Sequence, residues 1–469
     1  MDPREKWRTR FPWKLAEGQI PMRLNSLPTS ASQASPWLSH TLAADSSLSA
    51  PLMSATTADV CIVGGGYTGL WTAIELKHRD PSLDVVLLEA RVCGSGASGT
   101  NAGFLMNLWP KFPALVAHVG RAEAIRIAQA TSDAIEHIVA FCSEHHIDAK
   151  ISRIGWLWTS TTEDQDGAWN DTLQAIADAQ GNPLRLVDPD AATELSGHAA
   201  RGGALDPTAA TLQPAALARG LRRVAIEMGV RVFENTPVTG IGSSGEVSIE
   251  TIDGQVTSRS AVLAINAWAS AIPEIRRRLV LTASDNLITA PLAEGQLAAL
   301  GTDGVGTSDS RRLLNYWRTT SDGSALFGKG GVGLGFGHRG ASSLYGAAPR
   351  PRDLERQFRA TFPDLADVPI AATWRAPVEY SINSLPFFVP VSGQPRVFVG
   401  AGYSGDGVGP ACLGGKILAQ LGPRSRRRVE PIGIDPAPAR VASSRTDPIR
   451  RRTIGTRRPD PRRQRQVFG

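Results

Sequence analysis

The pattern of hydrophobic and polar residues is most regular between residues 59 and 89. An apolar run from Val60 to Val63 has the length and composition of a buried strand. After a glycine-rich turn, Leu70 and Ile74 recur at the four-residue spacing of a buried helix face. A second apolar run, from Val85 to Leu88, follows that helix. The pattern therefore predicts a unit of strand, turn, helix and strand.

The turn of this unit has the sequence Gly64-Gly65-Gly66-Tyr67-Thr68-Gly69. Gly64 permits a tight turn, Gly66 lets backbone N–H groups approach phosphate oxygens, and Gly69 lets the helix pack close to the strand. Glu89, 20 residues after Gly69, is placed to accept a hydrogen bond from a ribose hydroxyl. These four residues together predict a dinucleotide site.

The glycine spacing alone is weak evidence in a chain with 47 glycines. The same spacing also begins at Gly94, Gly240, Gly328, Gly335 and Gly400. Only the first match has a strand before it, a helix after it and an acid at the right distance. An ordinary strand-to-helix turn without a ligand is the alternative interpretation.

Three further segments follow this unit in order. The run from Gly94 to Phe104 is too rich in small residues for a helix interior and suits close backbone passage around a ligand. Gly202-Gly-Ala-Leu-Asp-Pro207 precedes an apolar-periodic helix and a strand that ends at Glu234. The segment from Arg396 to Pro410 reads RVFVGAGYSGDGVGP and runs into another helix. Together the segments resemble the D-amino-acid oxidase-like family of FAD-dependent oxidoreductases over about residues 55–421.

The resemblance implies an α/β (mixed α+β) fold with a discontinuous, Rossmann-like FAD-binding domain of the glutathione-reductase type and an antiparallel-sheet substrate domain. The expected FAD-binding segments are 55–107, 201–271 and 385–421, and the expected substrate-domain segments are 108–200 and 272–384. Residues 1–54 are expected to form a largely irregular extension, and residues 422–469 an Arg/Pro-rich disordered tail.

The resemblance also implies which residues contact FAD. Besides the four residues of the turn and its acid, these are Tyr67, Thr68, Ala90, Arg91, Ser98, Asn101, Ala102, Gly103, Val238, Gly405, Asp406, Gly407 and Val408. Backbone N–H groups of the last four would stabilise negative charge on the N1–O2 edge of the reduced flavin. A plain strand-to-helix turn is the alternative there. We expect non-covalent FAD, because Cys93 beside the flavin loop fits an ordinary free thiol better than an attachment point.

Residues 59–73, Gly155–Trp158 and Leu326–Gly331 resemble a branch of bacterial amine oxidases. That branch includes gamma-glutamylputrescine oxidase-like and aminophosphonate oxidoreductase-like proteins. It implies an enzyme that oxidises the C–N bond of a small-molecule amine or amino acid-like substrate by hydride transfer to flavin N5. The resulting imine would hydrolyse, and oxygen or another acceptor would reoxidise the flavin.

Three cationic residues are candidates for the substrate and for oxygen. Arg318 and Arg375 each follow a tryptophan and could grip a carboxylate or phosphonate with two hydrogen bonds. The alternative, which we favour for each, is a surface or interdomain salt-bridge residue. Lys329, with Gly328 before it and Gly330 after it, could place a cation that helps oxygen accept an electron by stabilising superoxide, or it could serve a structural turn.

Two other classes of function remain open from the sequence. One is a nicotinamide-dependent dehydrogenase that uses the first motif alone; the small-residue run and the closing segment disfavour it. The other is a flavin-binding protein that acts through its basic C-terminal tail. From Pro423 to Gly469 the chain has 14 Arg, no Lys and four acids, a charge of +10, so the other residues carry +6 − 10 = −4.

That tail could bind a nucleic acid or an anionic surface, be a solvated disordered tail, or mark a departure of the reading frame from the family after about Gly422. No nucleic-acid module accompanies the arginines, so we expect no nucleic-acid partner. No apolar run reaches the length of a membrane span, and four scattered cysteines suit free thiols, so a cytoplasmic enzyme is expected. His145-His146 lacks further ligands at suitable spacing, and no metal is expected.

Overall fold

The computed structural model describes residues 20–21, 35–302, 304–337 and 340–422. They belong to one compact unit, Met1–Asp435. The tail and most of the N-terminal extension lie outside the described residues, so the predictions for them stay open. One part of the extension is helical: α1 (Pro36–Ala44) begins after Ser35, whose side chain accepts a hydrogen bond from Leu38 N. This helix buries Trp37 and Leu38.

A nine-stranded sheet contains the predicted unit at its centre. β2 pairs in parallel with β12 on one side and with β3 on the other, β3 pairs in parallel with β9, and β12 also pairs in parallel with β19. The remaining pairings are antiparallel. The strands of this sheet are β1 (Ile20–Pro21), β2 (Ala55–Val63), β3 (Val85–Leu88), β9 (Arg231–Phe233), β10 (Val238–Ser244), β11 (Glu246–Thr251), β12 (Gln255–Leu263), β18 (Phe387–Val391) and β19 (Gln394–Ala401).

The two faces of β2 bury different cores. Val60 and Ile62 face a cluster that includes residues of α2 (Tyr67–Arg79), α8 (Pro214–Glu227) and α13 (Pro410–Leu421). Cys61 and Val63 face a second cluster, built with β10, β11 and β18. The continuous apolar run of β2 therefore reflects a strand covered on both faces, as in parallel sheets.

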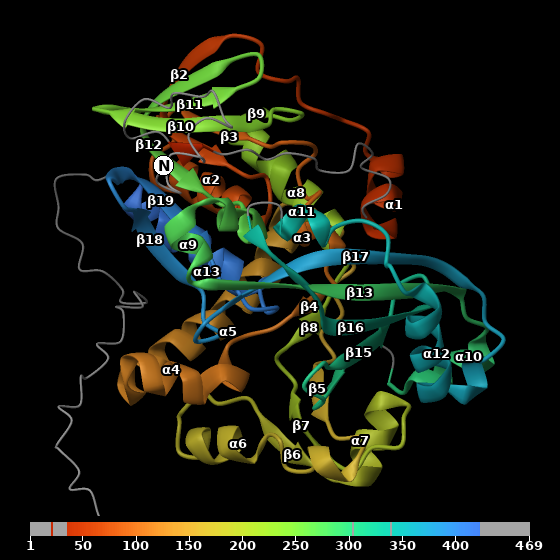
Figure 1. Cartoon of the computed structure of the whole chain (residues 1–469). Helices are drawn as coiled ribbons and strands as arrows, with labels where there is room; N and C mark the ends of the chain where they lie inside the picture. The colour runs from red at the N-terminus through yellow and green to blue at the C-terminus, as the bar shows by residue number, and fades with distance from the viewer. Residues whose placement is uncertain (1–19, 22–34, 303, 338–339, 423–469) are drawn as a thin grey trace, which may run out of the picture. The chain divides into compact units, whose positions relative to one another are not determined.

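An eight-stranded sheet forms the other half, in the order β17-β13-β16-β15-β14-β5-β7-β6. Only the β14–β5 pairing is parallel. In Figure 1 the long strands β13 and β17 run side by side; they pair antiparallel, with one shift of register between Ile288 and Thr289. The strands are β5 (Trp156–Thr159), β6 (Arg185–Val187), β7 (Gly203–Asp206), β13 (Leu279–Pro291), β14 (Gly306–Asp309), β15 (Asn315–Thr319), β16 (Ser324–Gly335) and β17 (Ile370–Ser381).

The remaining elements are one small sheet and several helices that lie outside the two large sheets. A two-stranded sheet joins β4 (Phe104–Leu105) to β8 (Ala210–Thr211). The remaining α-helices are α3 (Ala97–Thr100), α4 (Phe112–Val119), α5 (Arg121–Glu144), α6 (Asn170–Ile176), α7 (Pro189–Ser196), α9 (Pro273–Arg276), α10 (Glu294–Leu297), α11 (Gly340–Ser343) and α12 (Pro351–Thr361). A 3-10 turn, η2 (Trp109–Lys111), precedes α4, and η4 (Asn266–Ala271) follows β12.

The predicted mixed α/β fold is confirmed, as is the unit of β2, α2 and β3. Apart from β1, the strands of the nine-stranded sheet come from the three segments predicted to bind FAD. Three strands of these segments lie outside that sheet. β4 and β8 pair with each other. β7 lies within the predicted segment 201–271, yet it pairs with β5 and β6 in the eight-stranded sheet. The division into two domains otherwise stays a proposal.

Candidate active site

The turn after β2 depends on two glycines for different physical reasons. Gly64 has φ +109°, a conformation that L side chains rarely adopt, and a Cβ there would lie 2.3 Å from Ala264 O. Gly69 lies in α2, and its Cβ would lie 2.0 Å from Gly64 O. A side chain at either position would collide with backbone that cannot move aside. The turn is therefore a backbone cradle at the N-terminal end of α2, where the helix dipole favours an anion.

Glu89 lies directly after β3, beside this turn. Its Oε2 accepts a hydrogen bond from Gly65 N at 2.7 Å, and its Oε1 accepts one from Arg91 N at 3.0 Å. Burial raises the pKa of the Glu89 carboxyl, and these two hydrogen bonds oppose the shift. A carboxylate held next to a glycine turn fits the acceptor of a ribose hydroxyl.

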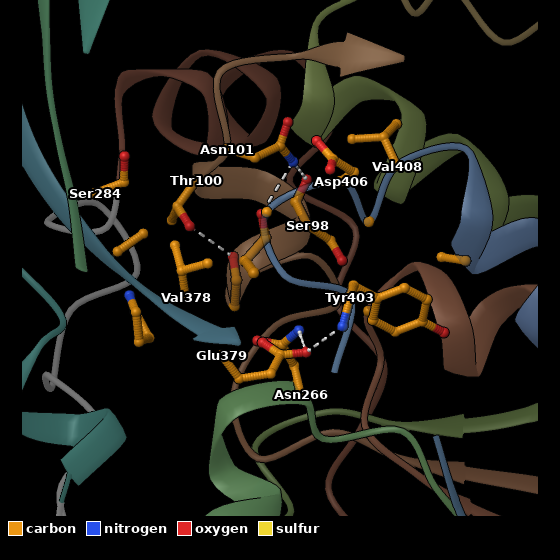
Figure 2. A pocket seen from close by; sticks show the side chains of 18 of the residues that line it. Ser98, Thr100, Asn101, Asn266, Ser284, Val378, Glu379, Tyr403, Asp406 and Val408 are labelled. Atoms are coloured by element: carbon orange, nitrogen blue, oxygen red, sulfur yellow. Dashed lines mark hydrogen bonds between the residues drawn. The ribbon is translucent and has the colours of Figure 1, made fainter. Parts of the chain in front are cut away.

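The small-residue run forms the short helix α3 and its exit. Ser98 Oγ accepts a hydrogen bond from Tyr67 N at 2.9 Å, which joins α3 to the first turn of α2. The Asn101 side chain donates to Ala97 O and Ser98 O and accepts from Gly103 N. Figure 2 shows Ser98 and Asn101 at one wall of the cavity, with the dashed bonds of Asn101. The run is thus ordered by its own side chains.

The closing segment forms a loop between β19 and α13. Gly405–Val408 lie in this loop, just before the helix that begins at Pro410. Lys111 of η2 holds this loop in place: its Nζ lies 2.6 Å from Asp406 Oδ2 and donates a hydrogen bond to Ser404 O at 3.2 Å. In Figure 2 Asp406 and Val408 lie on the same side of the cavity as Asn101.

A single cavity of about 550 Å³ connects these parts. At one end it is lined by the glycine turn, Glu89 and α3, and at the other by side chains of the eight-stranded sheet. The predicted FAD-contact residues that line it are Gly64, Gly66, Tyr67, Thr68, Glu89, Ala90, Ser98, Asn101, Ala102, Val238, Gly405, Asp406, Gly407 and Val408.

Three predicted FAD contacts do not line the cavity. Gly69 and Gly103 lie behind it, where each lets two backbone segments come close. Arg91 instead donates to the Tyr345 hydroxyl at 2.7 Å and lies over the Tyr345 ring, at 5.2 Å from its centre. These residues shape the wall, so any contact with FAD by them stays a prediction.

The other end of the cavity is rich in aromatic side chains. Trp156 and Trp158 are two residues apart on β5, and their rings stack with centroids 6.2 Å apart. Tyr316 packs edge-on against Phe104, with ring centroids 5.7 Å apart. Trp156 Nε1 donates to Ser308 Oγ at 3.1 Å. Tyr316 donates to Asn286 Oδ1 at 2.7 Å, and burial raises the pKa of its hydroxyl. These hydrogen bonds fix the rings in place.

The structure does not bring Arg318 to this cavity. Arg318 is buried and donates to three backbone carbonyls, those of Ala102, Thr319 and Leu212, at 2.7 to 3.0 Å. Burial lowers the pKa of its guanidinium to about 10. Through these hydrogen bonds its side chain ties β15 to the segments next to β4 and β8, and a substrate role for Arg318 stays a prediction.

Arg375 is likewise occupied elsewhere. Its Nε and Nη2 bond to the two carboxylate oxygens of Asp285 at 2.5 and 2.8 Å. Asp285 lies directly opposite on β13. Neither residue lines the cavity, whereas the next residue, Ala376, does. The pair is a cross-strand ion pair, and a substrate role for Arg375 stays a prediction without support from its position.

Lys329 lies on β16, on the face that is turned away from the cavity. Its neighbour Gly330 lines the cavity, and side chains alternate between the two faces of a strand. Lys329 Nζ donates to Leu313 O and to Asn315 Oδ1, both at 3.2 Å. The structure does not bring Lys329 to the cavity, and its catalytic role stays a prediction.

Sequence reasoning missed several cavity residues. The ammonium of Lys111 and the carboxylates of Asp309 and Glu379 all line the cavity. Nothing in their local sequence marks them, because each reaches the cavity from a different element. The tryptophans of β5 had a usable signal: at i and i+2 in a strand they share one face.

Two further searches concern metals and membranes. Within the described ranges, no group of three His, Cys, Asp or Glu side chains could hold a metal ion. In that same part of the chain, none of the helices combines the length and the apolar character needed to cross a bilayer.

Comparison with known proteins decides the family. The model of the family described as FAD dependent oxidoreductase, abbreviated DAO, matches residues 59–421. The chain belongs to this family. The match spans the glycine turn, both sheets and the closing loop, and it replaces the nicotinamide alternative with FAD as the cofactor.

Curated relatives of the DAO family cover most of the chain. Gamma-glutamylputrescine oxidoreductase of Escherichia coli is 30% identical over 378 residues, which are 79% of this chain and 84% of the relative. The Haemophilus influenzae protein named probable oxidoreductase OrdL is 26% identical over 79% of this chain and 84% of its own length.

Solved structures support the DAO fold. Glycine oxidase from Geobacillus kaustophilus superimposes with a TM-score of 0.60 at 20% identity, covering 78% of this chain and 94% of the other. L-proline dehydrogenase from P. horikoshii gives a TM-score of 0.63 at 19% identity, covering 79% and 93%. At this identity the likeness establishes the fold alone.

The site fits FAD on its own geometry. The turn offers a cradle that side chains at Gly64 or Gly69 would fill, and Glu89 offers a fixed acceptor beside it. At the far side, Asn266 Oδ1 is buried without a hydrogen-bond partner among the described residues, an acceptor ready for an N–H donor. A pyrophosphate, a ribose and a flat ring with one N–H match this set.

Proposed function

We propose that the protein is a FAD-dependent amine oxidase. It oxidises the C–N bond of an amine or amino acid-like substrate, and the imine formed hydrolyses to a carbonyl compound and ammonia or a smaller amine. Oxygen is the proposed electron acceptor and the cytoplasm the proposed location. The four cysteines, all described and all free, support the location.

The observation that carries the proposal is the continuity of the cavity. The dinucleotide end, with the glycine turn and Glu89, opens into an end lined by Trp156 and Tyr316. A cofactor held at the first end can therefore present its reactive ring at the second. Bound there, FAD would supply the redox chemistry, as the acceptor of a hydride from the carbon next to nitrogen.

The protein's own residues exclude water and orient the amine. Apolar aromatic faces surround the substrate end, and a neutral amine suits them better than an ammonium ion. The polar atoms among them are already engaged: Tyr316 with Asn286, Trp156 with Ser308, and Ser284 with Lys329 O. We find no Ser–His–Asp arrangement among the cavity-lining residues, and hydride chemistry requires none.

The names of relatives support an amine as the substrate class. The Escherichia coli relative is named for gamma-glutamylputrescine, and solved structures of like fold are named for glycine, proline and iminodiacetate. All four compounds carry a C–N bond next to an oxidisable carbon. Among them we propose the gamma-glutamylputrescine-type branch, because the relative named for that compound is 30% identical over 79% of this chain, against 25% over 77% for a glycine oxidase.

The test is anaerobic reduction of the purified flavoprotein by a panel of primary amines, secondary amines, amino acids and aminophosphonates. A substrate should bleach the visible absorption of the flavin, and admitted oxygen should restore it. Tert-butylamine, whose carbon next to nitrogen bears no hydrogen, is the matched control and should not bleach it. Protein without flavin, or a flavin that no amine bleaches, would overturn the proposal.

A further inference from the structure

Four carboxylates line the cavity, and one of them differs from the rest. Asp406 lies 2.6 Å from Lys111 Nζ, and Asp309 Oδ2 lies 3.3 Å from Arg311 Nε. Burial raises the pKa of Glu89, while two backbone hydrogen bonds and the nearby charge of Arg91 oppose that shift. Glu379 on β17 forms no salt bridge with any described residue, although it is only 2% exposed. A buried carboxylate without a cation is costly, and such groups cluster at functional sites.

Neutral groups alone hold the Glu379 side chain. Its Oε1 accepts hydrogen bonds from Asn266 Nδ2 at 2.8 Å, Gly402 N at 3.1 Å and Tyr403 N at 3.4 Å. Figure 2 shows Glu379 beside Asn266, with dashed lines to it and to the backbone of Tyr403. Burial raises the pKa of this carboxyl to about 7, against the pull of these hydrogen bonds. Both of its protonation states are therefore accessible near neutrality.

Glu379 is joined to the closing loop in two ways. The two N–H groups that meet its Oε1 belong to residues just before Gly405, the start of the stretch assigned to the flavin edge. Its own carbonyl accepts a hydrogen bond from Ser404 N at 3.1 Å. A change of charge at the closing loop therefore acts directly on the Glu379 carboxylate, which is hydrogen-bonded to that loop.

We propose that Glu379 is the redox-linked proton acceptor of the site: it is ionised while the cofactor is oxidised and takes up one proton when electrons enter the cavity. The proposal deepens the function above and rests on its FAD site. In turnover the balance is simple. The substrate ammonium loses one N–H proton, which Glu379 takes up, as the carbon next to nitrogen loses a hydride to the bound flavin, and the protonated imine remains.

Magnitudes support this coupling. A tenfold rise in proton affinity, one pKa unit, corresponds to about 1.4 kcal/mol. At an effective dielectric constant of about 20, the interaction energy of two unit charges has this value when they are about 12 Å apart. Glu379 lines the same cavity as the closing loop, so charge arriving on the bound cofactor would raise its pKa by a unit or more.

The tyrosines and carboxylates packed around Glu379 are neutral or paired, so Glu379 is the group among them that we expect to change protonation on reduction. Tyr380 and Tyr403 face it, and burial raises the pKa of both hydroxyls, so both are neutral at pH 7. Of the nearby carboxylates, Asp406 is paired with Lys111. Asp285, on the neighbouring strand β13, is paired with Arg375.

The test is the pH dependence of the flavin midpoint potential of the holoenzyme, measured with a dye-coupled reductant and no amine. Between an oxidised-state pKa near 7 and a higher reduced-state pKa, Glu379 is ionised before reduction and protonated after it. Each proton taken up on reduction changes the equilibrium constant for reduction tenfold per pH unit, which shifts the midpoint potential by about 30 mV per pH unit for two electrons. The wild-type slope between pH 7 and 8 should be steeper than that of Glu379→Gln by about half this amount for a one-unit pKa shift, and by more for a larger shift.

Two variants and one direct measurement make the outcome decisive. Gln keeps Oε1 as the acceptor for the three N–H groups, so Glu379→Gln should retain FAD and its melting temperature. Asp309→Asn, which changes a cavity carboxylate paired with Arg311, should keep the wild-type slope. In the wild type alone, the reduced-minus-oxidised infrared spectrum at pH 7.5 should gain the C=O band of a protonated carboxyl.

Equal slopes in wild type and Glu379→Gln, loss of the extra slope in Asp309→Asn instead, or no new carboxyl band would each overturn the proposal. The infrared result stands even if Glu379→Gln fails to bind FAD. Because the reductant is not an amine, these outcomes are independent of whether any amine is oxidised. The failure of the amine panel and the failure of this proposal are thus distinguishable.

Discussion

The two ends of the cavity are built by different means. The dinucleotide end comes from one contiguous stretch, β2, α2 and β3, and its chemistry belongs mainly to the backbone. The substrate end is assembled from β5, β14, β15 and β17, which are separated by many residues, and its chemistry belongs to side chains. A backbone cradle is set by local spacing, whereas a side-chain wall is set by which face each strand turns to the cavity.

That difference explains what the sequence could predict. The glycines at 64 and 69 and the acid at 89 have a fixed spacing with a fixed physical reason, and the structure puts them at one turn. The predictions for Arg318 and Lys329 rest only on their positive charge and on the residues next to them in sequence. The direction in which each side chain points depends on strand pairing, and both side chains donate to backbone carbonyls outside the cavity lining.

Glu379 and Lys111 show the same limit from the other side. Each lines the cavity, yet neither lies in a motif that local sequence could mark. Lys111 and its partner Asp406 are 295 residues apart in the sequence, and Glu379 and its partner Asn266 are 113 residues apart. Only the fold brings such pairs together, so the sequence could predict the cofactor class but not the charged groups around the reacting centre.

The strongest way to break the comparison is a methyl group in the backbone cradle. Gly64→Ala combines a φ of +109° with a Cβ 2.3 Å from a carbonyl oxygen. We expect FAD affinity to fall at least 100-fold, about 2.7 kcal/mol, measured by flavin content and titration of the apoprotein. Gly295→Ala, where a Cβ would meet nothing within 4 Å, is the control and should bind FAD normally.

Truncation at the aromatic wall should separate substrate handling from cofactor binding. Trp156→Ala removes an indole that stacks on Trp158 and lines the substrate end. We expect kcat/KM for the best amine to fall about 30-fold, about 2 kcal/mol, with FAD content unchanged. Trp169→Ala touches the same cluster from outside the cavity and should lower stability while keeping kcat/KM within about threefold. Equal losses in both variants would contradict the assignment of this wall.

The cation at the closing loop should have a smaller, specific effect. Lys111 Nζ holds Asp406 and Ser404 O, so Lys111→Met should loosen the loop and remove a positive charge from the cavity. We expect reoxidation by oxygen to slow about tenfold, while anaerobic reduction by the amine changes less. Stopped-flow measurement of the two half-reactions checks this. Equal slowing of both would instead indicate a general loss of loop order.

Lys329→Met is the sharpest comparison, because sequence and structure expect different results. A lysine that assists oxygen would, on removal, slow reoxidation about 100-fold. In the structure burial and the charge of Arg311 lower the pKa of Lys329, and its ammonium bonds to Leu313 O and Asn315 Oδ1 behind the cavity wall. We therefore expect reoxidation within about threefold of wild type and a stability loss of about 1 kcal/mol from the missing hydrogen bonds.

The same stopped-flow trace decides between these two expectations for Lys329→Met, with Lys111→Met as the matched removal of an ammonium on the cavity side. A 100-fold slower reoxidation in Lys329→Met would restore the oxygen role and require β16 to turn its other face inward during the reaction. A result within threefold leaves the charged side chains that line the cavity, Lys111 of η2 first, as the groups that act on oxygen. A place on the cavity lining, more than residue type alone, would then select the reactive charges at this end.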